Sequence, residues 1–223
     1  MDLFEAITTT ISVRRFTDAP VTDDEILTCI RAATHAPSGG NIQPWQFLVV
    51  RDAALRRALG DLYRRAYARY EPAVVRTLPP SRSDEDKARS ERMLASARHL
   101  AAHIGEVPAM VLVLMLMPNI SMTLEDAQGP LDVGTPFASV FPAVQNFMLA
   151  ARGLGIGTTL TTVYRIFQGE VRALCAIPER YEIVALIPMG RPQKRFTVGR
   201  RRPPEQVTHW DRFGNKRKGG PPS

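Results

Sequence analysis

The most constraining feature of the sequence is the run AMVLVLMLM at residues 109–117. A run of apolar residues this long and without polar alternation predicts a buried strand. It is about half the length that a membrane-spanning helix needs, since such a helix takes about 20 residues. Other elements must therefore cover this strand, and a chain of 223 residues with 44% hydrophobic residues can supply them.

Two further segments have the composition of strands, WQFLVV at 45–50 and residues 182–189. The strands are few and are separated by helical patterns, which favours a mixed α/β architecture. The stretch 136–153 predicts a long apolar helix that contains Pro142. Burial in the core or across a dimer interface would both satisfy so apolar a helix.

Helix start and stop signals predict the remaining elements. Thr22 and Glu25 have the spacing of a capping box, and the helix that they begin should stop near Ala36, because Pro37 disfavours helix in the residue before it. Asp2 and Glu5 have the same spacing and could form a capping box at the start of a short helix. Further helices are expected over 3–10, 53–70, 84–103 and 170–174, an extended segment over 158–162, and loops over 71–83 and 118–135.

The net charge of +7 is concentrated near the end of the chain. Residues 191–218 hold ten Lys/Arg and two Asp/Glu, and the rest holds 19 basic against 20 acidic residues. A basic tail that lacks interleaved aromatic residues apart from Trp210 and Phe213 does not support nucleic-acid binding. The start of the chain shows no apolar signal core, and Cys29 and Cys175 are far apart. We therefore expect a cytoplasmic protein without membrane or nucleic-acid partners.

The segment APSGGNIQPW at 36–45 is rich in groups that could contact a ligand. Adjacent glycines let a backbone approach a ligand closely. Asn41 and Gln43 alternate with Ile42, so both amides could point to one side and bond a polyhydroxyl chain or a heteroaromatic edge. An ordinary loop whose amides bond its own backbone is an equally good interpretation of these residues alone.

Four motifs in order give the sequence a resemblance to a known family. SVRRF at 12–16, APSGGNIQPWQF, LAARGLGIGTTLTT and GRRRPPEQVTHW together resemble the FMN-dependent nitroreductase family. The resemblance implies an α+β fold with a central mixed or antiparallel sheet flanked by helices, in an intertwined homodimer. It implies one FMN-binding domain over 1–211, with a variable helical excursion at 71–105 and a basic, flexible tail at 212–223.

The resemblance also implies the cofactor contacts. Ser12, Val13 and Arg14 would lie at the flavin phosphate, since a guanidinium fork matches phosphate geometry. The extended segment Thr161, Thr162 and Val163 would lie along the flavin ring. Across the dimer the loop residues Pro37, Ser38, Gly39, Asn41 and Gln43 would make further contacts, and Arg200 and Arg202 would form a second phosphate clamp. Phe137 and Phe141 are candidates for lining the substrate site, although plain core positions would suit them equally.

The activity that this family implies is a ping-pong transfer of hydride. NADH or NADPH would reduce FMN, which would then reduce a small nitroaromatic, quinone or enone-type acceptor, and no side chain need act as the catalytic acid or base. One departure stands out, because Thr10 and Ile11 occupy positions where the family usually has arginine. A flavin-binding or storage protein without efficient turnover is therefore an alternative. A flavin-destructase or dehalogenase-like member of the same fold is a further alternative that the sequence leaves open.

Other motifs are weaker. His99 and His103 have the spacing of a zinc pair on a helix, but no third ligand is evident, so we expect no metal. GLGIG at 153–157 ends a helix instead of opening one, which argues against a dinucleotide-binding loop.

Overall fold

Four antiparallel strands form the central sheet of the computed structural model, which describes residues 1–78, 80, 83–117, 123–126, 129–132 and 137–216. The strand order is β1 (Trp45–Val50), β2 (Ala109–Leu116), β6 (Tyr181–Gly190) and β5 (Gly157–Thr158). The strands expected at 45–50, 109–117 and 182–189 are confirmed, as is the α+β class with an antiparallel sheet.

The central strand β2 is buried on both faces, which explains why its sequence does not alternate. Alternate side chains of a strand point to opposite faces. The odd-numbered ones from Ala109 to Met115 belong to one core and the even-numbered ones from Met110 to Leu114 to the other. The helices α2 (Asp23–Thr34) and α5 (Phe137–Gly153) pack on the first face.

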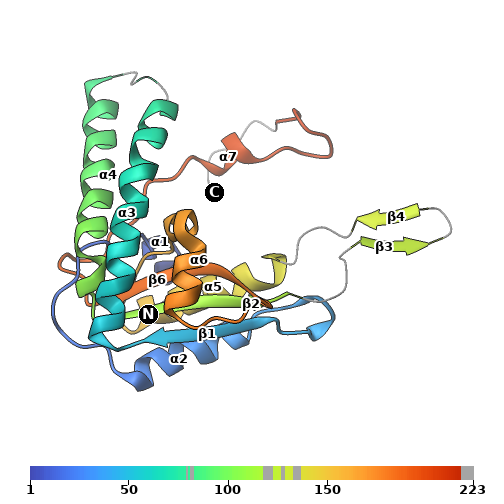
Figure 1. Cartoon of the computed structure of the whole chain (residues 1–223). Helices are drawn as coiled ribbons and strands as arrows, with labels where there is room; N and C mark the ends of the chain where they lie inside the picture. The colour runs from blue at the N-terminus through green and yellow to red at the C-terminus, as the bar shows by residue number, and fades with distance from the viewer. Residues whose placement is uncertain (79, 81–82, 118–122, 127–128, 133–136, 217–223) are drawn as a thin grey trace.

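The second face is covered by α3 (Ala53–Thr77), the end of α4 (Asp84–His103), η2 (Ile104–Glu106) and α6 (Gln168–Leu174). Figure 1 shows α3 and α4 standing side by side away from the sheet, with α2 across the opposite face. Only Leu100 and Ala101 of α4 are buried. The N-terminal half of α4 therefore projects beyond the core.

Helix caps occur where the sequence predicts them. Thr22 and Glu25 form a reciprocal capping box at the start of α2, and α2 ends at Thr34, two residues before Ala36. Asp2 accepts hydrogen bonds from the first turn of α1 (Leu3–Thr9). Pro142 lies inside α5, in its second turn.

The loop expected over 71–83 is wrong for its first part, because α3 continues to Thr77 with Pro72 inside it. A proline inside a helix removes one backbone hydrogen bond and normally favours a break. Here tertiary contacts hold the additional turns. Glu71 forms an ion pair with Arg98 of α4, with 2.6 Å between Oε1 and Nε, and the two helices contact each other.

The loop expected over 118–135 is also wrong for its described part. β3 (Thr123–Asp126) and β4 (Gly129–Asp132) pair antiparallel and project away from the main sheet (Figure 1). Backbone pairing needs no apolar alternation, so the sequence pattern did not reveal this two-stranded ribbon. Residues 118–122, 127–128 and 133–135 of the expected loop lie outside the described residues.

The remaining elements are short: η1 (Gly39–Asn41), η3 (Val163–Phe167) and α7 (Pro204–Val207). In the chain's last described part, the amide of Asn215 donates to the Arg212 carbonyl and that of Trp210 to the Asn215 carbonyl. The rest of the tail, 217–223, lies outside the described residues, so its expected flexibility and the domain boundary at 211 stay predictions. No helix in the described ranges is long and apolar enough to cross a membrane.

Candidate functional site

The segment that contains Ser12 and Arg14 is fixed against the edge of the sheet. Ser12 forms a parallel bridge with Thr158, and the Val13 amide donates to the Thr158 carbonyl at 2.9 Å. The Thr159 hydroxyl donates to the Val13 carbonyl. A Cβ at Gly157 would approach Val13 to 2.7 Å, so only glycine permits this close packing. The backbone thus positions both predicted ligand side chains before any ligand binds.

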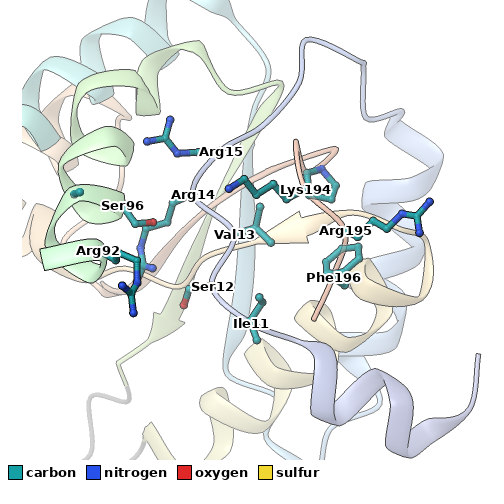
Figure 2. Close-up of a pocket in the computed structure, with 12 residues that line it drawn as sticks. Ile11, Ser12, Val13, Arg14, Arg15, Arg92, Ser96, Lys194, Arg195 and Phe196 are labelled. Atoms are coloured by element: carbon teal, nitrogen blue, oxygen red, sulfur yellow. The ribbon is translucent and has the colours of Figure 1, made fainter. Parts of the chain in front are cut away.

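A cavity of about 410 Å³ opens beside this segment, and we call it the basic cavity. Ser12 and Ser96 contribute hydroxyls to its lining, and Phe196 contributes an aromatic ring. Figure 2 shows Arg14 and Arg92 reaching toward each other and Lys194 extending across the upper part, whereas the head groups of Arg15 and Arg195 point outward. The cations of its lining are Arg14, Arg15, Arg92, Lys194 and Arg195.

Most of these cations have no anionic partner among the residues that the structure describes. Within the described residues, Arg14, Arg92 and Lys194 form no ion pair with a carboxylate. Arg15 instead bonds His99, with 2.9 Å between Nη1 and Nδ1. Burial, and then the charge of Arg15, lower the pKa of His99, so its ring is neutral and accepts that bond. Unpaired cations that converge on one cavity with hydroxyl donors favour an anionic ligand.

A second cavity of about 250 Å³, the tyrosine cavity, lies between α3, α4 and the sheet edge. Tyr63, Tyr67 and Tyr70 line it from one face of α3, at spacings of four and three residues. The Tyr63 hydroxyl lies 2.9 Å from the Thr161 hydroxyl. Burial raises the pKa of Tyr63, so the phenol stays protonated and can hold Thr161 in place.

Arg14 connects the two cavities because it lines both of them. The predicted ring-binding residues Thr161, Thr162 and Val163 also line the tyrosine cavity. The structure therefore brings the 12–14 and 161–163 segments together. The arrangement suits a ligand with an anionic end and a planar aromatic part, since aromatic side chains pack well against flat rings.

The loop at 37–43 has an unusual backbone. Gly40, Asn41 and Gln43 have φ values of 57°, 53° and 46°. Non-glycine residues adopt this conformation at a cost of about 1 kcal/mol or more each, and such strain is often found at binding sites. The side-chain amide of Gln43 donates from Nε2 to the Asn41 Oδ1 at 3.0 Å, so the two side-chain amides do lie together. The Gly39 amide donates to the Ser139 hydroxyl and ties the loop to α5.

Within one chain this loop lies far from the basic cavity. The loop precedes Trp45, which pairs with Met115, whereas the 12–14 segment adjoins β5, whose Thr158 pairs with Met189 opposite Ala109. The two ends of β2 are roughly 20 Å apart, at about 3.3 Å per residue. The five loop residues (Pro37, Ser38, Gly39, Asn41, Gln43) line neither cavity.

The two candidate phenylalanines lie in the first turns of α5, the helix to which the 37–43 loop is hydrogen-bonded. The rings of Phe137 and Phe141 lie 6.1 Å apart near the start of α5, close to the Ser139 that binds the loop. Phe137 is half-buried and Phe141 is 43% exposed. Neither lines the basic cavity or the tyrosine cavity. Their role in binding substrate stays a prediction.

The tail arginines also lie outside the two cavities. Arg200 is 3.6 Å from Glu85 at the start of α4, and the preceding Gly199 amide donates to the Thr8 carbonyl. Arg200 and Arg202 are exposed and line neither cavity. The part of the tail that reaches the basic cavity is instead Lys194–Phe196. The predicted clamp by Arg200 and Arg202 therefore stays a prediction.

Sequence reasoning missed several residues of both cavities. The only available signals were helical spacing, with Arg92 and Ser96 four residues apart, and the tyrosines on one face of α3. The metal alternative gains no support. The His99 and His103 rings lie 4.4 Å apart, but His103 bonds Glu106 at 2.9 Å, and the described residues contain no group of three potential ligands with metal-binding geometry.

The fold and the site define a class of α+β protein with two adjoining cavities, one basic and one lined by tyrosines, at the edge of an antiparallel sheet. The chain belongs to the nitroreductase family, because the model of that family matches residues 7–191. By this membership it is an NAD(P)H oxidoreductase of the nitroreductase type.

Particular relatives agree with this membership. The chain is 26% identical over 214 residues to an NADH dehydrogenase of Thermus thermophilus, covering 89% of this chain and 91% of the relative. It is 28% identical over 189 residues to 5,6-dimethylbenzimidazole synthase of Rhodospirillum rubrum, covering 83% and 80%. A crystal structure of iodotyrosine deiodinase bound to FMN and 3-iodo-L-tyrosine has the same fold, with a TM-score of 0.71 at 22% identity, covering 95% of this chain and 100% of that one.

Proposed function

We propose that this protein is an FMN-dependent oxidoreductase that uses NADH or NADPH to reduce nitroaromatic, quinone or enone-type acceptors. The observation that carries the proposal is the position of Arg14, whose side chain lines the basic cavity and the tyrosine cavity at once. A phosphate in the first cavity and a ring along Thr161–Val163 are the two ends of one FMN molecule. When bound, FMN supplies the redox chemistry.

The residues of the chain fit this cofactor. Ser12 offers a hydroxyl, and Arg14 and Lys194 offer unpaired charge, as a phosphate requires. The protonated Tyr63 holds the Thr161 hydroxyl at the ring position. Tyr67 and Tyr70 supply aromatic rings against which an aromatic acceptor can pack. None of these roles requires a side chain to transfer a proton.

We further propose that the protein acts as a homodimer. The strained 37–43 loop lies at the opposite end of the sheet from the basic cavity of its own chain, so it can contact a ligand there only from a second copy. Leu3, Phe4 and Ile7 of α1 are 62%, 71% and 47% exposed, which leaves an apolar surface for a partner to cover. In such a dimer Phe137 and Phe141 would lie near the ligand site of the second copy, next to the loop.

An absorbance spectrum before and after anaerobic NADH or NADPH tests the function. We expect yellow protein whose flavin absorbance is lost on addition of the nucleotide and returns with a quinone or nitroaromatic acceptor. Colourless protein that FMN cannot reconstitute would exclude the proposal. Flavin that binds without losing absorbance would instead favour a storage protein.

A second candidate is favoured by the 28% identity to 5,6-dimethylbenzimidazole synthase. In that case the flavin itself would be the substrate, and aerobic incubation with the reductant would consume it irreversibly. A dehalogenase-like activity is tested in the same assay by offering a halogenated phenol as acceptor and measuring halide release.

A further inference from the structure

Helix α4 contributes to both cavities from adjacent positions. Arg92, Ala95 and Ser96 line the basic cavity, and Met93, Leu94 and Ala97 line the tyrosine cavity. Any contact that fixes α4 from one cavity therefore also shapes the wall of the other. The helix needs such a contact, because its buried residues, Leu100 and Ala101, lie only near its C-terminal end.

Arg92 differs from the other arginines of this helix. Arg89, one turn earlier, is held by Glu85 and Asp86 at 2.9 Å each, and Arg98 is held by Glu71 at 2.6 Å. Arg92 has no such carboxylate among the described residues and points toward Arg14 in the basic cavity (Figure 2). Two guanidiniums that face one cavity without an anion repel each other, so an anion between them would hold α4 to the 12–14 segment.

Ile11 contributes no charge to the basic cavity. It lines the basic cavity beside Ser12 and cannot bind an anion. The charge that position 11 does not provide is supplied on the opposite wall of the same cavity by Arg92, with Ser96 one turn further along α4.

We propose that Arg92 and Ser96 complete the FMN phosphate site and that this contact couples the cofactor to the acceptor site. The bound phosphate draws α4 toward Arg14, and this sets the positions of Met93, Leu94 and Ala97 in the wall of the tyrosine cavity. The acceptor site is then complete only in protein that holds the phosphorylated cofactor. This inference rests on the proposed FMN site and goes beyond it.

The first test compares dissociation constants of FMN and of riboflavin, which lacks the phosphate, by fluorescence quenching. Arg92→Ala should weaken FMN binding roughly ten- to a hundredfold, the range for one charge-assisted hydrogen bond, and leave riboflavin binding unchanged. Arg89→Ala is the matched control, since that arginine is already paired within α4, and it should change neither constant. FMN affinity equal to the unmodified protein's in Arg92→Ala, or an equal loss for both flavins, would overturn the inference.

The second test measures hydrogen exchange of α4 at saturating flavin. FMN should protect residues 84–97 more than riboflavin does, and this difference should vanish in Arg92→Ala but persist in Arg89→Ala. Equal protection by the two flavins would refute the coupling. If the unmodified protein binds neither flavin, the proposed function also falls, whereas FMN binding that is indifferent to Arg92 removes this inference alone.

Discussion

The two faces of the central sheet differ in what their side chains do. The face under α2 and α5 is packed with apolar residues such as Val144 and Phe147, which are almost fully buried. The face under α3 and α4 combines a smaller apolar core with arginines, tyrosines and both cavities. The comparison indicates that one face mainly stabilises the fold and leaves the other free to carry unpaired charge for a ligand.

The largest expected effect comes from the first face. Phe147 is fully buried in α5 and its ring lies 6.3 Å from that of Phe47. Phe147→Ala should lower the free energy of unfolding by about 3–5 kcal/mol, because it leaves a cavity that the surroundings fill only partly. Denaturant unfolding measures this loss. A change below about 1 kcal/mol would show that the α2–α5 face does not carry the stability.

On the second face, replacing Arg14 is expected to change ligand binding and not stability. Arg14→Ala should weaken FMN binding by about 1.5–3 kcal/mol, or roughly ten- to a hundredfold. It should leave the stability of the flavin-free protein nearly unchanged, because the described residues give Arg14 no ion pair to lose. Titration with FMN and thermal unfolding without it separate the two effects. Unchanged affinity would mean that Arg14 does not bind the phosphate.

A smaller, pH-dependent effect is expected at the start of α2. A hydrogen bond from the Thr22 backbone, and then Arg191, hold the pKa of Glu25 below its ordinary value of 4.5. Because the pKa of Glu25 is lowered in the folded state, its carboxylate stabilises the protein fully above the ordinary pKa of 4.5. This stabilisation is lost as the pH falls through the lowered pKa. Glu25→Gln should therefore cost about 1 kcal/mol at pH 7.

Thermal unfolding of both proteins at pH 7 and at pH 3 checks this expectation. The difference between them should shrink at the lower pH, because the native carboxylate is increasingly protonated there. A difference that grows on acidification would contradict the assigned interaction. Flavin binding at pH 7 should be the same in both proteins, since Glu25 lines neither cavity.

The smallest effect is expected for Ile11→Arg, which adds a cation to the basic cavity. FMN binding should tighten by no more than about threefold, which is less than about 1 kcal/mol, since the new charge also repels the cations already present. The gain should decrease with added salt, because salt screens exposed charges. Riboflavin is the matched ligand control and should bind as before. Equal tightening of both flavins would show that position 11 does not face the phosphate.

Local patterns in the sequence were sufficient for much of the fold. The run at 109–117 predicted the central strand, and Thr22 with Glu25 predicted the start of α2, because burial and capping depend on residues close in the chain. The extension of α3 past Pro72 could not be predicted in this way, since it depends on packing against α4 and on the Glu71–Arg98 pair. The β3–β4 ribbon was missed because its four-residue strands carry too little pattern.

The candidate site, like the fold, was predicted from the sequence only in part. The motifs indicated Ser12, Arg14 and Thr161, and the structure brings these residues to adjoining cavities. Apart from the four-residue spacing of Arg92 and Ser96, nothing local to Arg92 or Lys194 marks them as cavity residues, since each is one of many cations in a charged segment. The sequence by itself determined the buried strand, the helix caps and the resemblance to a family. Only the tertiary structure decided which cations share a cavity, because residues 14, 92 and 194 meet through long-range packing and not through any local pattern.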